Sequence, residues 1–226
     1  MNITTLKPGD ITFWDRFAPW YEKWLMRGKY HKIILRELRC IIEKEWSVVD
    51  IGAGTGVSPI SMASFGCNVT ALEPSGGMID IFRHKLDVLS TSNIEIQKSK
   101  WEDCSHQDSQ IYDLILACNS LHLVHGGFVT AMTKVFEFRP LNVCFITEIN
   151  NDYFIDFKEI DSLQNEYNFL FIKTYSVDSS FCFKDMNEVN ELQDVVDSKI
   201  EIQMEQDTPV QIDKTDIAIL CWERKK

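Results

Sequence analysis

Several common features are missing from this 226-residue chain, and each absence narrows what the protein can be. No apolar run approaches the roughly 20 residues that a transmembrane helix requires, and the N-terminus lacks the apolar core of a secretory signal peptide. The seven cysteines form no Cys-x-x-Cys pair, and no Cys or His pair has the spacing of a zinc finger. We therefore expect free thiols in the reducing cytoplasm, with no metal and no membrane contact.

Positive charge is also scarce. The chain has 23 Lys and Arg residues against 34 Asp and Glu residues, which gives a formal net charge of −11. A protein that binds nucleic acid over a broad surface needs basic side chains to neutralise the phosphates. The composition therefore argues against a nucleic-acid partner, and it leaves the oligomeric state open.

Apolar runs alternate with helical patterns over much of the chain. Apolar side chains recur at helical spacing within residues 10–45, and later helical patterns lie near 58–65, 76–89 and 124–138. Between them lie short apolar runs that are typical of buried strands: Ser47–Ile51, Asn68–Leu72, Ile94–Gln97, Tyr112–Ala117 and Asn142–Glu148. This alternation predicts an α/β fold with a mostly parallel, Rossmann-like sheet and helices on both faces.

The C-terminal part follows a different pattern. Lys199–Glu205 alternates apolar and polar residues with period two, and Ile217–Trp222 is a second short apolar run. Two consecutive strands without a helix between them pair antiparallel. We therefore predict a strand pair over 199–226, which completes a seven-stranded sheet with an antiparallel last strand. Two further helices are predicted before it, over Tyr153–Tyr167 and Met186–Val196.

One glycine-rich segment carries the strongest functional signal. An apolar run ends in Asp50-Ile51 and passes directly into Gly52-Ala53-Gly54-Thr55-Gly56, and Ser58-Pro59 opens the next helix. Glycines let the backbone turn tightly and let a ligand approach the helix N-terminus. The second strand ends at Glu73, whose carboxylate suits the hydroxyls of a ribose. The turn and the acid together predict a nucleoside pocket.

Asp50 distinguishes between two nucleoside ligands. Dinucleotide-binding proteins use Gly-x-Gly-x-x-Gly to approach a pyrophosphate, whereas this chain has Gly-x-Gly-x-Gly with an acid just before it. A carboxylate at that point repels a pyrophosphate, but it suits the ammonium and sulfonium groups of S-adenosylmethionine. A nicotinamide-dependent oxidoreductase is therefore the weaker hypothesis.

The chain resembles the class I S-adenosylmethionine-dependent methyltransferases, in the form common among small-molecule enzymes. Asp50–Gly56 is similar to the first motif of that family, and Val69–Ser75 followed by Met78 is similar to the second. Asp113–Asn119 resembles the motif of the fourth strand. The resemblance covers residues 45–150 and extends to the remainder only through the order of the elements.

The resemblance implies a set of residues around S-adenosylmethionine, and each group in the set faces one part of that molecule. The methionine part, with its ammonium on Asp50, would lie against Asp50, Gly52, Ala53, Gly54 and Thr55. The ribose and adenine would lie against Glu73, Pro74, Met78, Trp101 and Glu102, with Asp103 as the alternative to Glu102. The amine and the carboxylate would be reached from Cys118, Asn119 and either Tyr21 or Tyr30.

His122 is the candidate catalytic residue. It follows the fourth strand within Cys118-Asn119-Ser120-Leu121-His122, which resembles the Ser-Leu-His region of small-molecule methyltransferases. Histidine titrates near neutrality, so His122 could take a proton from a hydroxyl, thiol or amine acceptor. Packing on the following helix is an equal alternative for His122 and the preferred interpretation for His125.

Together these interpretations predict one methyltransferase domain over residues 1–226. Its parts are a helical lid (10–45), a cofactor-binding core (46–150), an acceptor-side insertion (150–198) and the C-terminal strand pair. We expect in-line transfer of the methyl group to a small-molecule acceptor, with S-adenosylhomocysteine as the second product. A protein or peptide methyltransferase and a non-catalytic cofactor-binding scaffold are the alternatives.

Overall fold

The computed structural model of the chain describes residues 10–105, 111–149 and 166–226. Two helices come first, α1 (Ile11–Arg27) and α2 (Tyr30–Ile41). Strands and helices then alternate as β1 (Ser47–Ile51), α3 (Val57–Phe65), β2 (Asn68–Leu72), α4 (Gly76–Leu89), β3 (Ile94–Gln97), β4 (Leu114–Cys118), α5 (Gly127–Glu137) and β5 (Asn142–Glu148). The strands predicted for this part of the chain, and the helices predicted near 58–65, 76–89 and 124–138, are confirmed to within three residues at their ends, and the helical region predicted over 10–45 contains α1 and α2.

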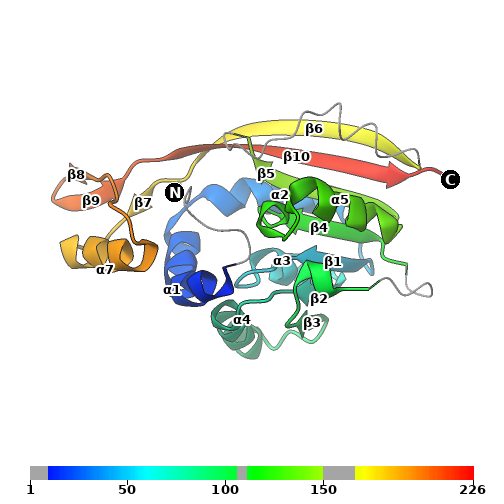
Figure 1. The fold of residues 1–226 in the computed structure, drawn as a ribbon, viewed down its shortest axis with the longest axis horizontal. Helices are drawn as coiled ribbons and strands as arrows, with labels where there is room; N and C mark the ends of the chain where they lie inside the picture. The colour runs from blue at the N-terminus through cyan, green and yellow to red at the C-terminus, as the bar shows by residue number, and fades with distance from the viewer. Residues whose placement is uncertain (1–9, 106–110, 150–165) are drawn as a thin grey trace.

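The C-terminal part is built on two long strands. Its elements are β6 (Tyr167–Asp178), β7 (Phe181–Cys182), α7 (Met186–Val196), β8 (Gln203–Glu205), β9 (Thr208–Gln211) and β10 (Lys214–Arg224). β6 and β10 run side by side along the length of the molecule (Figure 1). The elements between them form a small unit at one end of this ribbon, residues 179–213, which we call the appendage.

The main sheet has seven strands in the order β3-β2-β1-β4-β5-β10-β6. β1 to β5 run parallel to one another, and β10 is antiparallel to both of its neighbours, β5 and β6. The predicted α/β class, the seven-stranded sheet and the antiparallel last strand are therefore confirmed.

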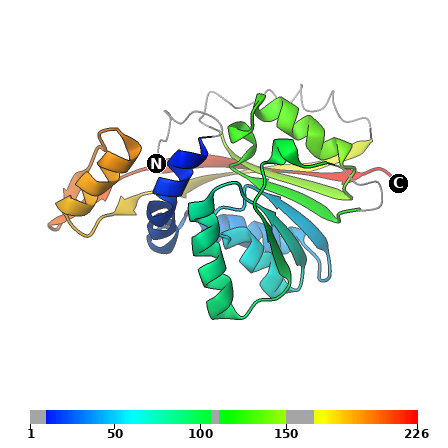
Figure 2. The same cartoon turned by 60° about the horizontal axis from the view of Figure 1, so that its bottom comes forward.

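Helices cover both faces of this sheet (Figure 2). α2 packs on one face through Ile34 and Leu38, in the same apolar cluster as residues of α3, β1, β4, β5 and β10. α4 lies beside α3, where Phe82 packs with Ile60. α5 covers the other face through Met132. The carboxyl ends of the parallel strands are left uncovered by these layers, and they form the edge at which ligands bind in open α/β sheets.

Two predictions for the C-terminal part are wrong. Lys199–Glu205 does not pair with the last strand, because its end forms β8, which pairs with β9 in a separate sheet ordered β7-β9-β8. The neighbour of β10 is β6, and Tyr167, predicted to end a helix, is the first residue of that strand. The rest of that predicted helix lies outside the described residues. The helix predicted over Met186–Val196 is confirmed as α7.

α1 is fastened to the appendage by apolar side chains and by one buried acid. The apolar contact consists of Phe13, Phe17, Trp20, Phe181, Phe183, Val189 and Leu192. Glu188 of α7 accepts hydrogen bonds from Arg27 at 2.7 and 3.1 Å, from Lys23 at 3.0 Å and from the backbone N–H of Lys184 at 2.7 Å. The Arg27 guanidinium is the main reason that the pKa of Glu188 is lowered to about 2.

Replacing Glu188 by Ala should lower the free energy of unfolding by about 2 kcal/mol, because Arg27 and Lys23 lose a mostly buried partner. Chemical denaturation at pH 7 measures the change, and Glu191→Ala, an exposed acid on the same helix, is the matched control. Since folding lowers the pKa of Glu188, its contribution is present above its ordinary pKa and is lost as the pH falls toward 2. A gap between the two proteins that does not shrink from pH 5 to pH 3 would contradict this assignment.

Candidate active site

The turn between β1 and α3 has no space for a side chain at Gly52 or at Gly56. Gly52, Gly54 and Gly56 have φ angles of 70°, 56° and 87°, in the left-handed region that glycine adopts readily. A Cβ on Gly52 would lie 2.4 Å from the Cβ of Ser120, and one on Gly56 would lie 2.2 Å from the ring of Phe82. The backbone itself therefore forms the surface of the turn, between the end of β4 and α4.

Glu73 fixes this turn to the end of β2. Its carboxylate accepts hydrogen bonds from the backbone N–H of Gly54 at 2.7 Å and from the backbone N–H of Ser75 at 2.8 Å. Burial raises the pKa of Glu73, although both hydrogen bonds act in the opposite direction. Pro74 and Met78 follow in the same segment, and Met78 is buried in the first turn of α4. The structure thus brings Glu73 to the glycine turn, as the sequence predicts.

Asp50 is a buried carboxylate that lacks a partner. It lies in β1 with 2% of its surface exposed, and its Oδ1 receives no hydrogen bond from the described residues. Burial, and secondly the nearby Glu73 carboxylate, raise the pKa of Asp50 well above its usual range. Buried polar atoms are nearly always hydrogen-bonded, so an orphaned carboxylate oxygen next to a turn indicates that a ligand supplies the donor.

A second orphaned oxygen lies at the end of β4, the strand that pairs with β1. Asn119 has a φ of 50°, and its Nδ2 donates to the hydroxyl of Tyr30 at 2.6 Å. Its Oδ1 is buried and has no hydrogen bond within the described part of the chain. Burial raises the pKa of the preceding Cys118 thiol, which therefore stays neutral. The ends of β1 and β4 thus present two unused acceptors at one edge of the sheet.

α1 lies across this edge. The ring of Tyr21 is 3.4 Å from the position that a Cβ on Gly54 would take. Burial is the main cause of the raised pKa of Tyr21. The nearby Cys118, Glu73 and Asp50 raise this pKa further. Asp15, also on α1, accepts hydrogen bonds at the start of α4 from the Oγ of Ser75 and the N–H of Gly77. These contacts bring α1 against the turn, and its role as a lid stays a prediction.

The sequence analysis missed two residues of this site, Lys85 of α4 and His31 of α2. The Nζ of Lys85 lies 3.3 Å from the Oγ1 of Thr55 in the glycine turn, and it pairs at 2.7 Å with an acid of α1, Glu22. His31 packs against the rings of both site tyrosines. No local pattern marks either residue, because they reach the turn only through the packing of α1, α2 and α4.

Three predicted residues are held by other contacts. Trp101 is buried below α5 and donates its indole N–H to the carbonyl of Ala131 at 3.1 Å, so core packing accounts for its ring. Glu102, in a 3₁₀ turn over Trp101–Asp103, accepts from the backbone N–H of His125 at 2.6 Å. His122 lies in the 3₁₀ turn Leu121–Leu123, where burial lowers the pKa of its imidazole. Roles for these three residues at a ligand stay predictions.

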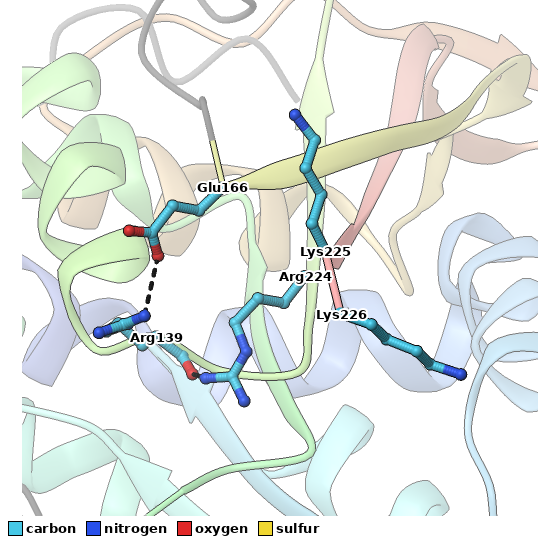
Figure 3. A pocket seen from close by; sticks show the side chains of 5 residues that line it. All are labelled: Arg139, Glu166, Arg224, Lys225 and Lys226. Atoms are coloured by element: carbon cyan, nitrogen blue, oxygen red, sulfur yellow. Dashed lines mark hydrogen bonds and ion pairs between the residues drawn. The ribbon is translucent and has the colours of Figure 1, made fainter.

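A cavity of about 540 Å³ lies away from the glycine turn. Figure 3 shows the five residues that line it, Arg139, Glu166, Arg224, Lys225 and Lys226. Arg139 pairs with Glu166 at 3.2 Å. β5 begins and β10 ends here, so the cavity lies at the opposite edge of the sheet from the carboxyl ends of β1 and β4. It is basic, whereas the turn region is surrounded by acids.

Two further features are absent from the residues that the structure describes. No group of three His, Cys, Asp or Glu side chains there could hold a metal ion. No helix in those ranges combines the length and the apolar character needed to cross a membrane.

Comparison with known proteins agrees with this geometry. Residues 48–138, less than half of the chain, match the family model described as methyltransferase domain. This part of the chain is similar to methyltransferase domains. The predicted resemblance to S-adenosylmethionine-dependent methyltransferases is therefore confirmed, and the matched region contains the glycine turn, Glu73 and the end of β4. No curated protein matches the sequence.

Solved structures share the fold at low sequence identity. A candidate methyltransferase from Bacillus halodurans has a TM-score of 0.61 and 12% identity, covering 85% of this chain and 99% of that one. Magnesium protoporphyrin IX methyltransferase from Synechocystis, solved with bound S-adenosylmethionine, has a TM-score of 0.56 and 12% identity, covering 86% and 77%. A candidate RNA methyltransferase from Pyrococcus horikoshii has a TM-score of 0.56 and 14% identity, covering 81% and 77%.

Binding of S-adenosylhomocysteine should release protons from this site. The raised pKa favours the protonated form of Asp50 in the free protein, and a bound ammonium group favours the ionised form. Affinity should therefore rise with pH until Asp50 is ionised in the free protein as well. Calorimetric titrations at pH 7 in buffers of different ionisation enthalpy measure the proton release, which Asp50→Asn should abolish. Net proton uptake, or an unchanged release in that variant, would show that Asp50 does not meet the ammonium.

Proposed function

We propose that this protein transfers the methyl group of S-adenosylmethionine to a small-molecule acceptor. The observation that carries the proposal is the buried, unpartnered Oδ1 of Asp50 beside the glycine turn. A pyrophosphate would bring negative charge and no ammonium donor to Asp50 and Glu73, whereas a ligand with an ammonium and no phosphate supplies the missing donor.

The residues at the edge of the sheet fit the parts of this cofactor one by one. The acceptor oxygens of Asp50 and Asn119 suit the ammonium group. The backbone of the glycine turn leaves room for the methionine part, and Lys85, beside Thr55, provides a cation for its carboxylate. Glu73 still has lone pairs for the ribose hydroxyls, because each of its oxygens accepts one backbone hydrogen bond.

Methyl transfer requires mainly that the protein aligns the two reactants and excludes water. When bound, S-adenosylmethionine supplies an electrophilic methyl group on a sulfonium, which the acceptor attacks in line with the carbon–sulfur bond. Holding the two reactants in this geometry lowers the entropic cost of bringing them together. α1 supports this role, because Tyr21 covers Gly54 and Asp15 joins α1 to the start of α4. Positive charge is dispersed during the transfer, so a dry pocket favours it.

Charge favours a small acceptor over a nucleic acid. The similar structures include both a magnesium protoporphyrin enzyme and a candidate RNA enzyme, and the shared fold does not choose between them. The chain has a net charge of −11, and the acids Asp50, Glu73 and Glu22 near the glycine turn outnumber the cation Lys85. The basic cavity lies at the opposite edge of the sheet from the turn.

The proposal predicts where a labelled methyl group will go. Purified protein is incubated with methyl-labelled S-adenosylmethionine and three fractions of one cell extract: RNA, protein, and molecules below about 1 kDa. Label should appear in the small-molecule fraction, and Glu73→Ala should reduce it at least about tenfold, because a charged hydrogen bond to the ribose contributes about 1.5–3 kcal/mol. Glu95→Ala, an exposed acid on β3, is the control. Label that is confined to RNA or protein would contradict the proposal.

A further inference from the structure

A histidine with no role in the mechanism described so far lies against the tyrosines of the site. His31 is the second residue of α2, and its ring centroid is 5.0 Å from Tyr30, 5.5 Å from Trp24 and 6.3 Å from Tyr21. Tyr21 covers Gly54, and Tyr30 holds the side chain of Asn119. His31 therefore contacts the glycine turn through the ring of Tyr21, and it contacts Asn119 at the end of β4 through the ring of Tyr30.

The nitrogens of this imidazole are available. Neither forms a hydrogen bond within the described residues, and the side chain is only partly buried. Burial, and secondly Lys85 of α4, lower the pKa of His31 to about 4. Tyr21 of α1 and Tyr30 of α2 are titratable groups in ring contact with it. The ring is thus neutral at pH 7 and carries a free lone pair on one nitrogen.

The neighbouring groups are less suited to accept a proton. The carboxylate of Glu73 is engaged by two backbone N–H groups. Lys85 is a cation paired with Glu22. Burial raises the pKa of the Cys118 thiol and of the Tyr21 and Tyr30 hydroxyls, which therefore stay protonated.

We propose that His31 takes the proton of the acceptor, and that the acceptor is a planar aromatic molecule with a hydroxyl group. Tyr21 and Trp24, which are only partly buried, offer aromatic rings against which such a molecule can pack. In the transfer, a lone pair of the acceptor oxygen forms the bond to the methyl carbon. The carbon–sulfur electron pair stays on sulfur, and the acceptor proton moves to the free nitrogen of His31. This inference rests on the proposed function, because it needs the methyl donor in place.

The test compares acceptors that differ in one atom. p-Cresol must lose a proton that does not leave unaided at pH 7, whereas 4-methylbenzenethiol ionises readily and needs no base. His31→Asn should lower transfer to p-cresol about 100-fold or more and should leave transfer to the thiol within a few-fold. His84→Asn, which changes an exposed histidine of α4, is the matched control. A merely structural role would reduce transfer to both probes alike.

A second measurement does not depend on turnover. In a ¹⁵N–¹H spectrum of the S-adenosylhomocysteine complex, p-cresol should shift the ring signals of His31, assigned by their loss in His31→Asn, and leave those of His84 in place. If the His31 signals do not move, or if His122→Asn and not His31→Asn loses transfer to p-cresol, the inference is wrong. Calorimetry separates the two failures: no binding of S-adenosylhomocysteine overturns the proposed function, whereas binding with unmoved His31 signals overturns only the role of His31.

Discussion

The turn between β1 and α3 must have glycine where neighbouring elements touch its backbone, and the site depends on this constraint. Three elements close on this one turn: the end of β4 at Gly52, α1 at Gly54 and α4 at Gly56. A side chain at Gly52 or Gly56 would displace a neighbour, and the left-handed φ angles of the turn would add strain. Glu73 completes the arrangement by accepting the N–H of Gly54. The same close packing that fixes the fold leaves a surface of backbone and acids for a ligand.

Electrostatics give this surface its selectivity. Asp50 and Glu73 are both buried, and each lies within the influence of other acids, which is unfavourable in the free protein. A cationic ligand relieves that cost and in turn stabilises the folded protein by binding to it. Lys85 stands on the other side of the turn beside Thr55, so the site offers opposite charges to the two ends of an amino acid.

The features that the sequence predicted are those that local pattern determines. Most of the parallel strands are short apolar runs bounded by turn residues, and the three motif glycines lie within the segment Gly52–Gly56. β6 was missed because it lies at the outer edge of the sheet, where polar residues such as Asn168, Lys173 and Thr174 are exposed and interrupt its apolar residues. The alternation at 199–205 arises because Ile200 and Ile202 are partly buried. The sequence pattern does not show that these two side chains pack against the cluster around α1 rather than against the main sheet. Lys85 and His31 reach the site through tertiary packing alone.

The central claim is that this site recognises the amino-acid end of a nucleoside. S-adenosylhomocysteine and 5′-methylthioadenosine share adenine, ribose and sulfur, and only the first carries an amino-acid group. Calorimetry should show at least about 100-fold tighter binding of S-adenosylhomocysteine to the wild-type protein, since two charged contacts contribute about 1.5–3 kcal/mol each. In Asp50→Asn the ratio should fall about tenfold or more, while the affinity for 5′-methylthioadenosine stays the same. Equal affinity of the wild-type protein for the two ligands, or tighter binding of NAD than of either, would contradict the account.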